Sequence, residues 1–271
     1  MQNKSIPIFV SADPALGAFN VSPGNDRFTV QFKNQLEIHP DARQITLEVV
    51  SAEIWWTVLN VKLGINDQFK LLVDGDGSSP YTITIEPGLY DVTNLNSAVN
   101  RELINAGLAS GLVTITGDSA SQKIVLTLGV VGLQVEWAAQ TFFLLTGFNS
   151  AQLVPSIGFT TGSFSELAPN IANFSDVSSF LLHTDLVQTG ILIGDREAQV
   201  IANPQITVPP GSLINFSPDN PIKIAVPQLR GTRINQATFY ITDQLNRALD
   251  FNGEFFSLLL EIKYQDPDSI N

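Results

Sequence analysis

Short runs of alternating apolar and polar residues, separated by proline and glycine, limit how this chain can fold. Clear examples are Phe28–Phe32, Gln44–Val50 and Lys123–Leu128, in which apolar side chains recur at every second position. Such runs form strands with one buried face. About ten of them occur, and irregular segments rather than uniform hairpins connect them. The pattern predicts an all-β protein, a single jelly-roll sandwich built from two Greek keys.

Further strands are predicted from the same alternation and from the turn residues that bound each run. They are Leu36–Ile38, Trp55–Leu63, Phe69–Val73, Tyr81–Glu86, Leu112–Thr116, Ser178–Leu186, Ala198–Val208, Pro221–Val226, Ile234–Thr242 and Glu254–Tyr264. The last of these runs is apolar on both faces for most of its length. It is therefore expected to be a central strand that is covered on both sides.

The central stretch Tyr81–Phe148 is expected to be a packing unit with one helix of about four turns, in a crossover of the jelly roll. The helix is predicted over Val92–Ala106, where Leu95, Val99 and Leu103 form a stripe with a spacing of four residues. Asp91 or Thr93 can accept hydrogen bonds from the first turn, and Gly107 can supply a left-handed cap. A second, short helix is predicted over Ala138–Leu145.

Residues 1–27 contain three prolines and two glycines among scattered apolar side chains. This composition predicts an extended N-terminal arm that orders against the body or a neighbour. Residues 28–271 are expected to form the jelly-roll domain, and Ser150–Phe174 is predicted to be a long loop rather than a linker.

Composition narrows the classes of function. The net charge is −12, with 26 acidic and 14 basic residues. Direct binding to nucleic acid is therefore not expected, because that binding depends on lysine and arginine at phosphates. There is no cysteine, which excludes disulfides and thiolate sites. The sequence has no apolar run of membrane-spanning length and no signal-peptide core near Met1, so synthesis in the cytosol is expected.

For each candidate functional site, a structural role for the same residues is favoured. Asp67, Asp74 and Asp76 resemble the start of a calcium loop, but the later carboxylates are missing, so an exposed turn is favoured. His39 and His183 are the only histidines. A Ser/His/Asp arrangement around His183 lacks a nucleophile elbow, and two distant histidines make a metal site improbable.

The tryptophans Trp55, Trp56 and Trp137 could stack on a sugar, but a place in the core or an interface is favoured. No pair of acids suited to glycoside hydrolysis stands out. The prediction is accordingly no enzyme, no catalytic, cofactor-binding or metal site and no cofactor. Binding or structural functions remain.

The central stretch resembles the penton base family of adenoviruses and the penton-type vertex proteins of Polinton-like viruses and virophages. The matching residues are Ile85-Glu86-Pro87-Gly88, Tyr90, the helix with Leu95, Val99, Asn100 and Leu103, and Leu144-Leu145-Thr146-Gly147-Phe148. They cover about a quarter of the chain. The chain departs from the adenovirus pattern in lacking an Arg-Gly-Asp loop, since Arg230-Gly231-Thr232 is not one, and in being much shorter.

The resemblance implies a structural capsid protein, a homopentamer at the fivefold vertices of an icosahedral virion. Its implied partners are other copies of itself, the major capsid protein and a spike or fibre. The short length implies a compact vertex protein without a large upper insertion. The alternatives are another jelly-roll capsid or spike protein of the same virus type, forming trimers, or a carbohydrate-binding β-sandwich.

Overall fold

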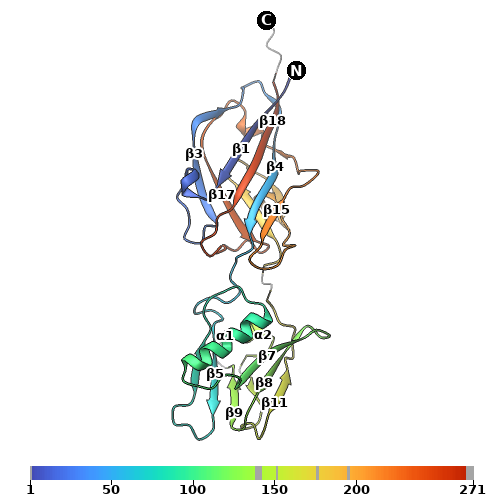
Figure 1. The fold of residues 1–271 in the computed structure, drawn as a ribbon. Helices are drawn as coiled ribbons and strands as arrows, with labels where there is room; N and C mark the ends of the chain where they lie inside the picture. The colour runs from blue at the N-terminus through green and yellow to red at the C-terminus, as the bar shows by residue number, and fades with distance from the viewer. Residues whose placement is uncertain (1, 138–141, 151, 175–176, 194–195, 267–271) are drawn as a thin grey trace. The chain divides into compact units, whose positions relative to one another are not determined.

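The chain forms two compact units in a computed structural model that describes residues 2–137, 142–150, 152–174, 177–193 and 196–266. One unit, the sandwich, combines Met1–Val58 with Val177–Asn271, and the other, the inserted unit, is Leu59–Asp176 (Figure 1). This division differs from the predicted arm and single domain. The central stretch folds around a core of its own.

The sandwich has two antiparallel sheets. One has the order β1-β18-β4-β15, with β16 also paired to β4, and the other has the order β13-β14-β12-β17-β3-β2. The first sheet contains β1 (Gln2–Ser11), β4 (Arg43–Trp55), β15 (Leu213–Phe216), β16 (Ile224–Ala225) and β18 (Ser257–Asp266). The second contains β2 (Ala18–Phe19), β3 (Arg27–Glu37), β12 (Phe180–Thr184), β13 (Ile191–Ile193), β14 (Arg196–Ala202) and β17 (Arg233–Asp243). Two 3₁₀ turns, η1 (Pro14–Leu16) and η2 (Pro227–Leu229), lie in the connections.

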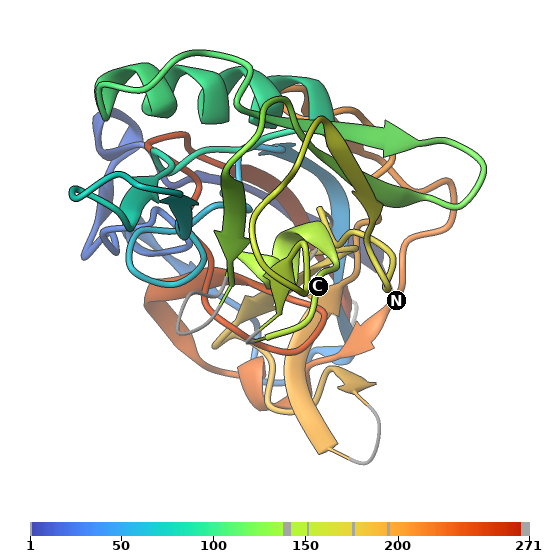
Figure 2. The same ribbon diagram turned by 90° about the horizontal axis from the view of Figure 1, so that it is seen from below.

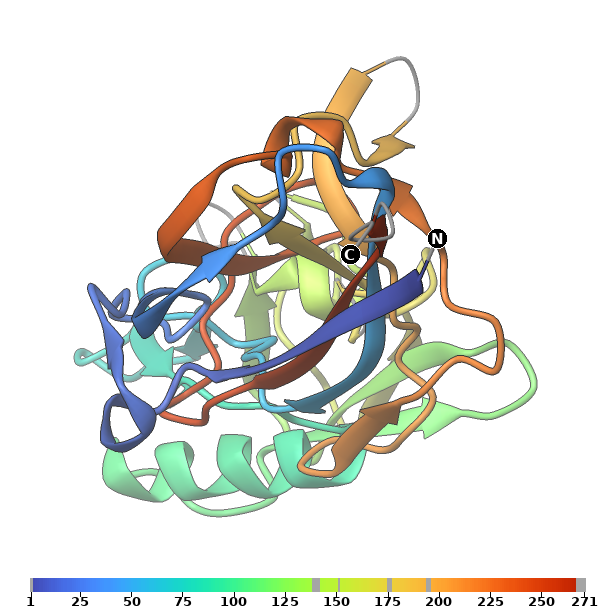
Figure 3. The ribbon, with the colours of Figure 1, turned by 90° about the horizontal axis from the view of Figure 1, so that it is seen from above.

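The strand order confirms the jelly roll. Within the two sheets, the first long strand, β1, pairs with the last, β18, and the second, β3, pairs with the next to last, β17. These pairings wind the chain into two Greek keys, which is the jelly-roll arrangement. Figure 3 shows β1 lying beside β18 along the full length of both strands.

The facing sides of the two sheets are joined by an aromatic core. Phe28 in β3 contacts Phe256, just before β18, with ring centroids 5.1 Å apart. Trp56, just after β4, contacts Phe180 in β12 at 6.0 Å. Phe251 connects the two groups through contacts with Phe180 and Phe256. Large buried aromatic side chains of this kind dominate the stability of a β-sandwich.

The N-terminal residues order against the body as an extended strand of the first sheet. Every residue of β1, from Gln2 to Ser11, is in antiparallel register with β18. The side chains of Ile8 and Val10 are 4% and 2% exposed. Their burial explains the apolar residues that the sequence reading assigned to an arm.

β18 is central, as predicted, but it is buried on one face only. Leu258, Leu260 and Ile262 are at most 1% exposed. On the opposite face, Leu259 is half-buried and pairs with Phe9 of β1, which is 61% exposed. An antiparallel sheet keeps one face open to solvent more readily than a parallel one.

The inserted unit has two small sheets and two helices. The four-stranded sheet has the order β10-β9-β5-β6 and the three-stranded sheet the order β11-β8-β7. The strands are β5 (Gln68–Val73), β6 (Tyr81–Thr84), β7 (Val113–Asp118), β8 (Lys123–Leu128), β9 (Leu133–Glu136), β10 (Leu153–Val154) and β11 (Phe164–Leu167). The helices are α1 (Val92–Asn105) and α2 (Phe143–Thr146). Figure 2 shows α1 along one side of this unit. None of the helices that the structure describes is long and apolar enough to cross a bilayer.

Two predicted segments differ from the structure. The strand predicted over Trp55–Leu63 was wrong after Trp55, where β4 ends. Its remaining apolar residues lie in the irregular connection to the inserted unit, where Trp56 and Val61 are buried. The predicted loop Ser150–Phe174 contains β10 and β11, which pair with β9 and β8. The predicted short helix is present as α2, and its residues 138–141 lie outside the described residues.

Helix α1 is confirmed within one residue of its predicted end. The Asp91 side chain accepts a hydrogen bond from the backbone N–H of Asn94 at 2.7 Å, which caps the first turn. Leu95, Val99 and Leu103 are 0% exposed. The edge of this buried face also contacts the sheet, because the Asn96 side chain accepts a hydrogen bond from the Ile115 N–H of β7 at 2.9 Å.

Replacing Asp91 with alanine is expected to lower the free energy of unfolding by about 1 kcal/mol, the usual effect of losing an N-cap side chain. Thermal or chemical denaturation monitored by circular dichroism measures this change. Asp91→Asn is the matched control, because asparagine caps a helix as well as aspartate does. An alanine variant as stable as the asparagine variant would contradict the assigned cap.

Candidate functional site

The three aspartates that resembled a calcium loop act in turns. Asp67 was expected in an exposed turn, but it is buried, with 3% of its surface exposed, and its Oδ2 accepts a hydrogen bond from the Gly64 N–H at 2.9 Å. Asp76 accepts hydrogen bonds from the Tyr81 hydroxyl at 2.6 Å and the Ser78 N–H at 2.8 Å. The Tyr81 hydrogen bond lowers the pKa of Asp76 below its usual value. Among the residues that the structure describes, no three His, Asp or Glu side chains come together as a metal site.

His183 lies within a stack of side chains across three neighbouring strands. Its ring, 1% exposed, is parallel to that of Tyr240, with centroids 4.3 Å apart. The Arg27 guanidinium lies 4.5 Å from the Tyr240 ring. Burial, with a smaller contribution from the Arg27 charge, lowers the pKa of His183 to about 4. A neutral, buried imidazole next to an arginine is a packing element of the second sheet.

The other members of an imagined Ser/His/Asp arrangement are engaged elsewhere. His183 Nε2 is 2.9 Å from the Thr242 hydroxyl, whereas Asp185 accepts a hydrogen bond from the Thr238 backbone N–H at 3.0 Å. His39 is exposed, and its Nδ1 accepts a hydrogen bond from the Asp41 N–H at 3.2 Å. The two histidines therefore serve local structure.

The tryptophans do not form a platform for a sugar. Trp137 is 1% and Trp56 is 6% exposed, so both belong to cores. Trp137 stacks on Phe148, with ring centroids 5.2 Å apart, inside the inserted unit. Trp55, at the end of β4, is 37% exposed. Stacking on a carbohydrate needs an accessible aromatic face, which leaves only Trp55 of the three.

The segment Arg230-Gly231-Thr232 is a tight turn after η2 rather than a receptor loop. The Gly231 N–H donates to the Ile38 carbonyl at 3.0 Å. The Thr232 hydroxyl donates to the Gln228 carbonyl at 3.0 Å. These bonds fasten the turn to the sandwich.

The residues that carry the family resemblance hold the inserted unit together. The Asn60 side chain accepts from the Tyr90 N–H at 2.9 Å and donates to the Tyr90 carbonyl at 2.7 Å. The Tyr90 ring lies over Gly88 so closely that a Cβ there would be 2.6 Å from the ring. The Asn100 side chain accepts from the Gly111 N–H at 2.6 Å.

The second matching segment is fixed in a similar way. Gly147 follows α2 with a φ of 80°, and a Cβ at this position would lie 2.4 Å from the Asn170 carbonyl oxygen. Leu145 and Phe148 are each 2% exposed and belong to the core of the inserted unit. The matching residues are therefore determinants of architecture.

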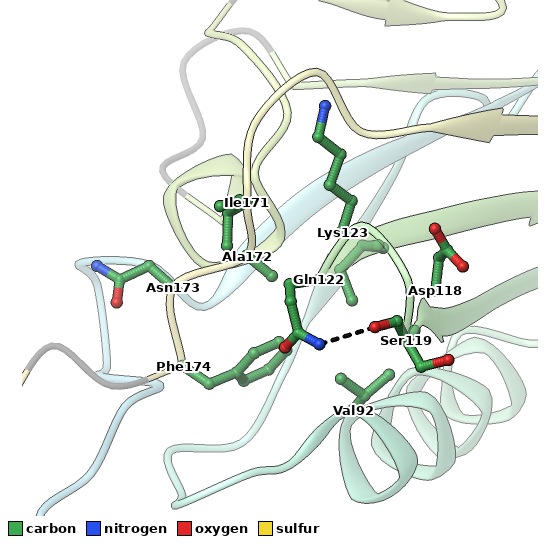
Figure 4. Close-up of a pocket in the computed structure, with 11 residues that line it drawn as sticks. Val92, Asp118, Ser119, Gln122, Lys123, Ile171, Ala172, Asn173 and Phe174 are labelled. Carbon is green, nitrogen blue, oxygen red and sulfur yellow. Dashed lines mark hydrogen bonds between the residues drawn. The ribbon is translucent and has the colours of Figure 1, made fainter.

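A hollow of about 490 Å³ opens on the inserted unit (Figure 4). Its walls are the first turn of α1, the turn between β7 and β8, and the segment 171–174. Apolar side chains from Val92, Ile124, Ile171, Ala172 and Phe174 line it, and Asp118, Ser119, Gln122, Lys123 and Asn173 form its polar part. We refer to it as the α1 hollow. Ile171 is 63% exposed although it lies in this wall.

A second feature of the inserted unit, missed by sequence reasoning, is the apolar turn Lys62–Asp67, called the Leu63 turn. Leu63 is 74% and Ile65 59% exposed. The sequence reading assigned Leu63 to the end of a strand. The available signal was a glycine between two aliphatic residues, followed by Asn66 and Asp67, which is typical of a turn.

The outer face of the first sheet carries a charge-balanced hollow of about 470 Å³. Lys4 pairs with Asp266. Lys263 pairs with Glu48, whose side chain is 2% exposed, and lies 3.1 Å from Glu261. Two of the three lysines that line this hollow, Lys4 and Lys263, therefore already have carboxylate partners, and Lys223 is the third.

Comparison with known proteins finds relatives by fold alone. No protein-family model and no curated protein matches the sequence. The crystal structure of the mavirus penton protein matches with 12% identity and a TM-score of 0.47, over 97% of this chain and 99% of that one. A chain in the cryo-electron microscopy structure of the Sputnik virophage matches with 13% identity and a TM-score of 0.43, over 96% and 97%. This chain is thus distantly similar in structure to a virophage penton protein.

Proposed function

We propose that this chain is a structural capsid protein that forms the homopentameric vertex, or penton, of an icosahedral virion. In this role it contacts other copies of itself and the major capsid protein, and it offers a seat for a spike or fibre. The protein is made in the host cell cytosol and resides in the virion. The observation that carries the proposal is the jelly-roll sandwich with an inserted unit whose structural residues are those of the penton resemblance.

The contacts of the aromatic and candidate catalytic side chains support a structural role over an enzymatic one. The large side chains in the described cores are packed together, as in the Phe69, Trp137 and Phe142 group of the inserted unit. Candidate catalytic side chains, such as His183 and Asp185, make separate structural contacts. The net charge of −12 also opposes direct contact with the genome.

Exposed apolar side chains support assembly. Eighteen large hydrophobic residues in the described parts of the chain are at least 36% exposed, including Phe9, Leu63, Ile65 and Ile171. Subunits of a closed ring cover such surface on two sides of each copy. Neighbouring exposed side chains, such as Leu63 and Ile65 in one turn, are candidates for burial in such contacts.

Stoichiometry tests the proposal. Purified 29.4 kDa chains are expected to form pentamers in sedimentation velocity and native mass spectrometry, and fivefold rings in electron micrographs. Trimers would favour a major capsomer or spike protein instead. A chain that remains monomeric at high concentration and within assembled particles would contradict a penton role, and glycan binding by such a monomer would favour the carbohydrate-binding alternative.

A further inference from the structure

The Leu63 turn is built to hold two aliphatic side chains rigidly in solvent. The Lys62 N–H donates to the Asn66 side chain at 2.7 Å, and the Asn66 side chain donates to the Asn60 carbonyl at 2.7 Å. The Asp67 carboxylate accepts from the Gly64 N–H. Asn60 and Asp67 are 8% and 3% exposed, so the turn is anchored by buried polar groups.

This rigidity matters for binding. A turn that is already ordered loses little conformational entropy when its side chains enter a partner. Exposure of Leu63 and Ile65 to water is unfavourable, and burying them in an interface recovers the hydrophobic contribution of both side chains. The Leu63 turn therefore has the properties of an interface anchor.

The α1 hollow has the properties of a receptor for such an anchor. Its volume of about 490 Å³ falls in the range of roughly 300–1,000 Å³ that is typical of ligand sites. Figure 4 shows Val92, Ile171, Ala172 and Phe174 around the opening, with Asp118 at its edge. The apolar wall matches aliphatic side chains, and the position of Ile171 leaves its side chain available to a partner.

A lysine beside the turn can pair with an aspartate of the hollow, whose other charged side chain, Lys123, donates to the Pro169 carbonyl at 2.7 Å. Lys62, next to Leu63, is half-buried and has no ion-pair partner within the part of the chain that the structure describes. Asp118 lines the hollow, and its carboxylate accepts hydrogen bonds from the Ser121 N–H and hydroxyl, which lower its pKa. A copy that inserts Leu63 into the hollow can place Lys62 near Asp118.

We propose that the Leu63 turn of one copy inserts into the α1 hollow of the next copy and forms the contact that closes the ring between inserted units. The inference rests on the proposed pentamer and names its interface. The turn precedes β5, whereas the hollow is enclosed by α1, the β7–β8 turn and residues 171–174. The contact is heterologous, because each copy uses a different surface toward each neighbour, and heterologous contacts generate rings.

Disulfide trapping tests the contact directly, because the chain has no cysteine. A Leu63→Cys chain is mixed with a differently tagged Ile171→Cys chain, the mixture assembles into pentamers, and the pentamers are oxidised. A disulfide-linked heterodimer is expected in large excess over either homodimer, because the trapped positions face each other across the contact and a disulfide requires Cα atoms within about 7 Å. Ile157→Cys, at a side chain that is 90% exposed, replaces Leu63→Cys in the control.

Variants that weaken the contact provide a second measurement. Leu63→Ser with Ile65→Ser, and separately Ile171→Asp, are expected to raise the dissociation constant of the pentamer at least about tenfold. Ile157→Asp is the control and leaves the ring intact. All these positions are exposed, so unchanged melting temperatures verify that each chain is folded. An equimolar mixture of the two weakened variants forms dimers, because one intact turn and one intact hollow remain.

The outcomes separate this inference from the proposed function. If the wild-type chain forms pentamers and the Leu63, Ile65 and Ile171 variants form them equally well, the interface is elsewhere and only the inference is overturned. Equal trapping by Ile157→Cys also overturns it. A wild-type chain that stays monomeric contradicts both the proposed contact and the proposed penton function.

Discussion

Leu103→Asp is expected to prevent the inserted unit from folding. The Leu103 side chain is 0% exposed in α1 and belongs to the core that also contains Val99 and Ile115. A carboxylate at this position has no partner, and burying an unpaired charge costs several kcal/mol, comparable with the stability of a whole domain. Val99→Asp is expected to act in the same way. The measurement is the yield of soluble chain, together with the loss of a cooperative thermal transition.

Ile104→Asp is the matched control for this prediction. Ile104 is the next residue of α1 and is 57% exposed, so a carboxylate there remains hydrated. This variant is expected to fold with a change in the free energy of unfolding within about 1 kcal/mol. A Leu103→Asp chain that melts at the wild-type temperature would show that α1 does not bury this face.

Acidification is expected to destabilise the sandwich through His183. The pKa of this imidazole falls from about 6.5 in the unfolded chain to about 4 in the folded one, because the ring is buried. Below pH 6.5 the imidazole therefore binds a proton in the unfolded chain and stays neutral in the folded chain. The free energy of unfolding therefore decreases as the pH falls from about 6.5 to about 4. The difference between the two pKa values corresponds to a total decrease of about 3 kcal/mol.

His183→Gln isolates this contribution. Glutamine does not titrate and has polar atoms that can replace the contact with Thr242. Urea denaturation from pH 7.5 to 4.5 is expected to show a smaller loss of stability in the variant than in the wild-type chain. His39→Gln, at an exposed histidine, is expected to follow the wild type. Parallel curves for the wild type and His183→Gln would mean that the buried ring does not resist protonation.

The regular elements could be predicted because their local signals agree with their packing. In α1, the capping aspartate Asp91 and the stripe of Leu95, Val99 and Leu103 all indicate one helix, and the structure buries that face. β8 was predicted at its observed bounds, Lys123–Leu128, because its alternation matches its burial. The jelly roll followed from the number of such strands and the irregular length of their connections.

The division into units could not be read in the same way. Alternation reports that a side chain is buried but not which core buries it, so the residues after Trp55 looked like a continuing strand. Residues 1–27 looked like an arm because the partner of β1 is β18, at the other end of the chain. The local sequence of a strand does not indicate a partner that is so distant along the chain.

The proposed contact surfaces were also beyond reach of the sequence. Leu63 has the composition of a strand residue, and only the hydrogen bonds of Asn66 and Asp67 show that it projects into solvent. The α1 hollow brings together Val92 and Phe174, which are distant in sequence. Asp76 accepts a hydrogen bond from the Tyr81 hydroxyl in the turn after β5, and His183 stacks on Tyr240 within the second sheet.

The sequence separation of β1 and β18 has a consequence for the order of biosynthesis. The sandwich needs residues 2–11 and 257–266 together, so a ribosome must finish almost all of the chain before the first sheet can close. Residues 59–176 are continuous, and their partners emerge one after another. Because domains fold as units during synthesis, the inserted unit is expected to reach its native state while the early sandwich strands still wait for their partners. During that interval β1, β3 and β4 lack β17 and β18 and have unpaired edges, which makes them sites of possible aggregation in the nascent protein.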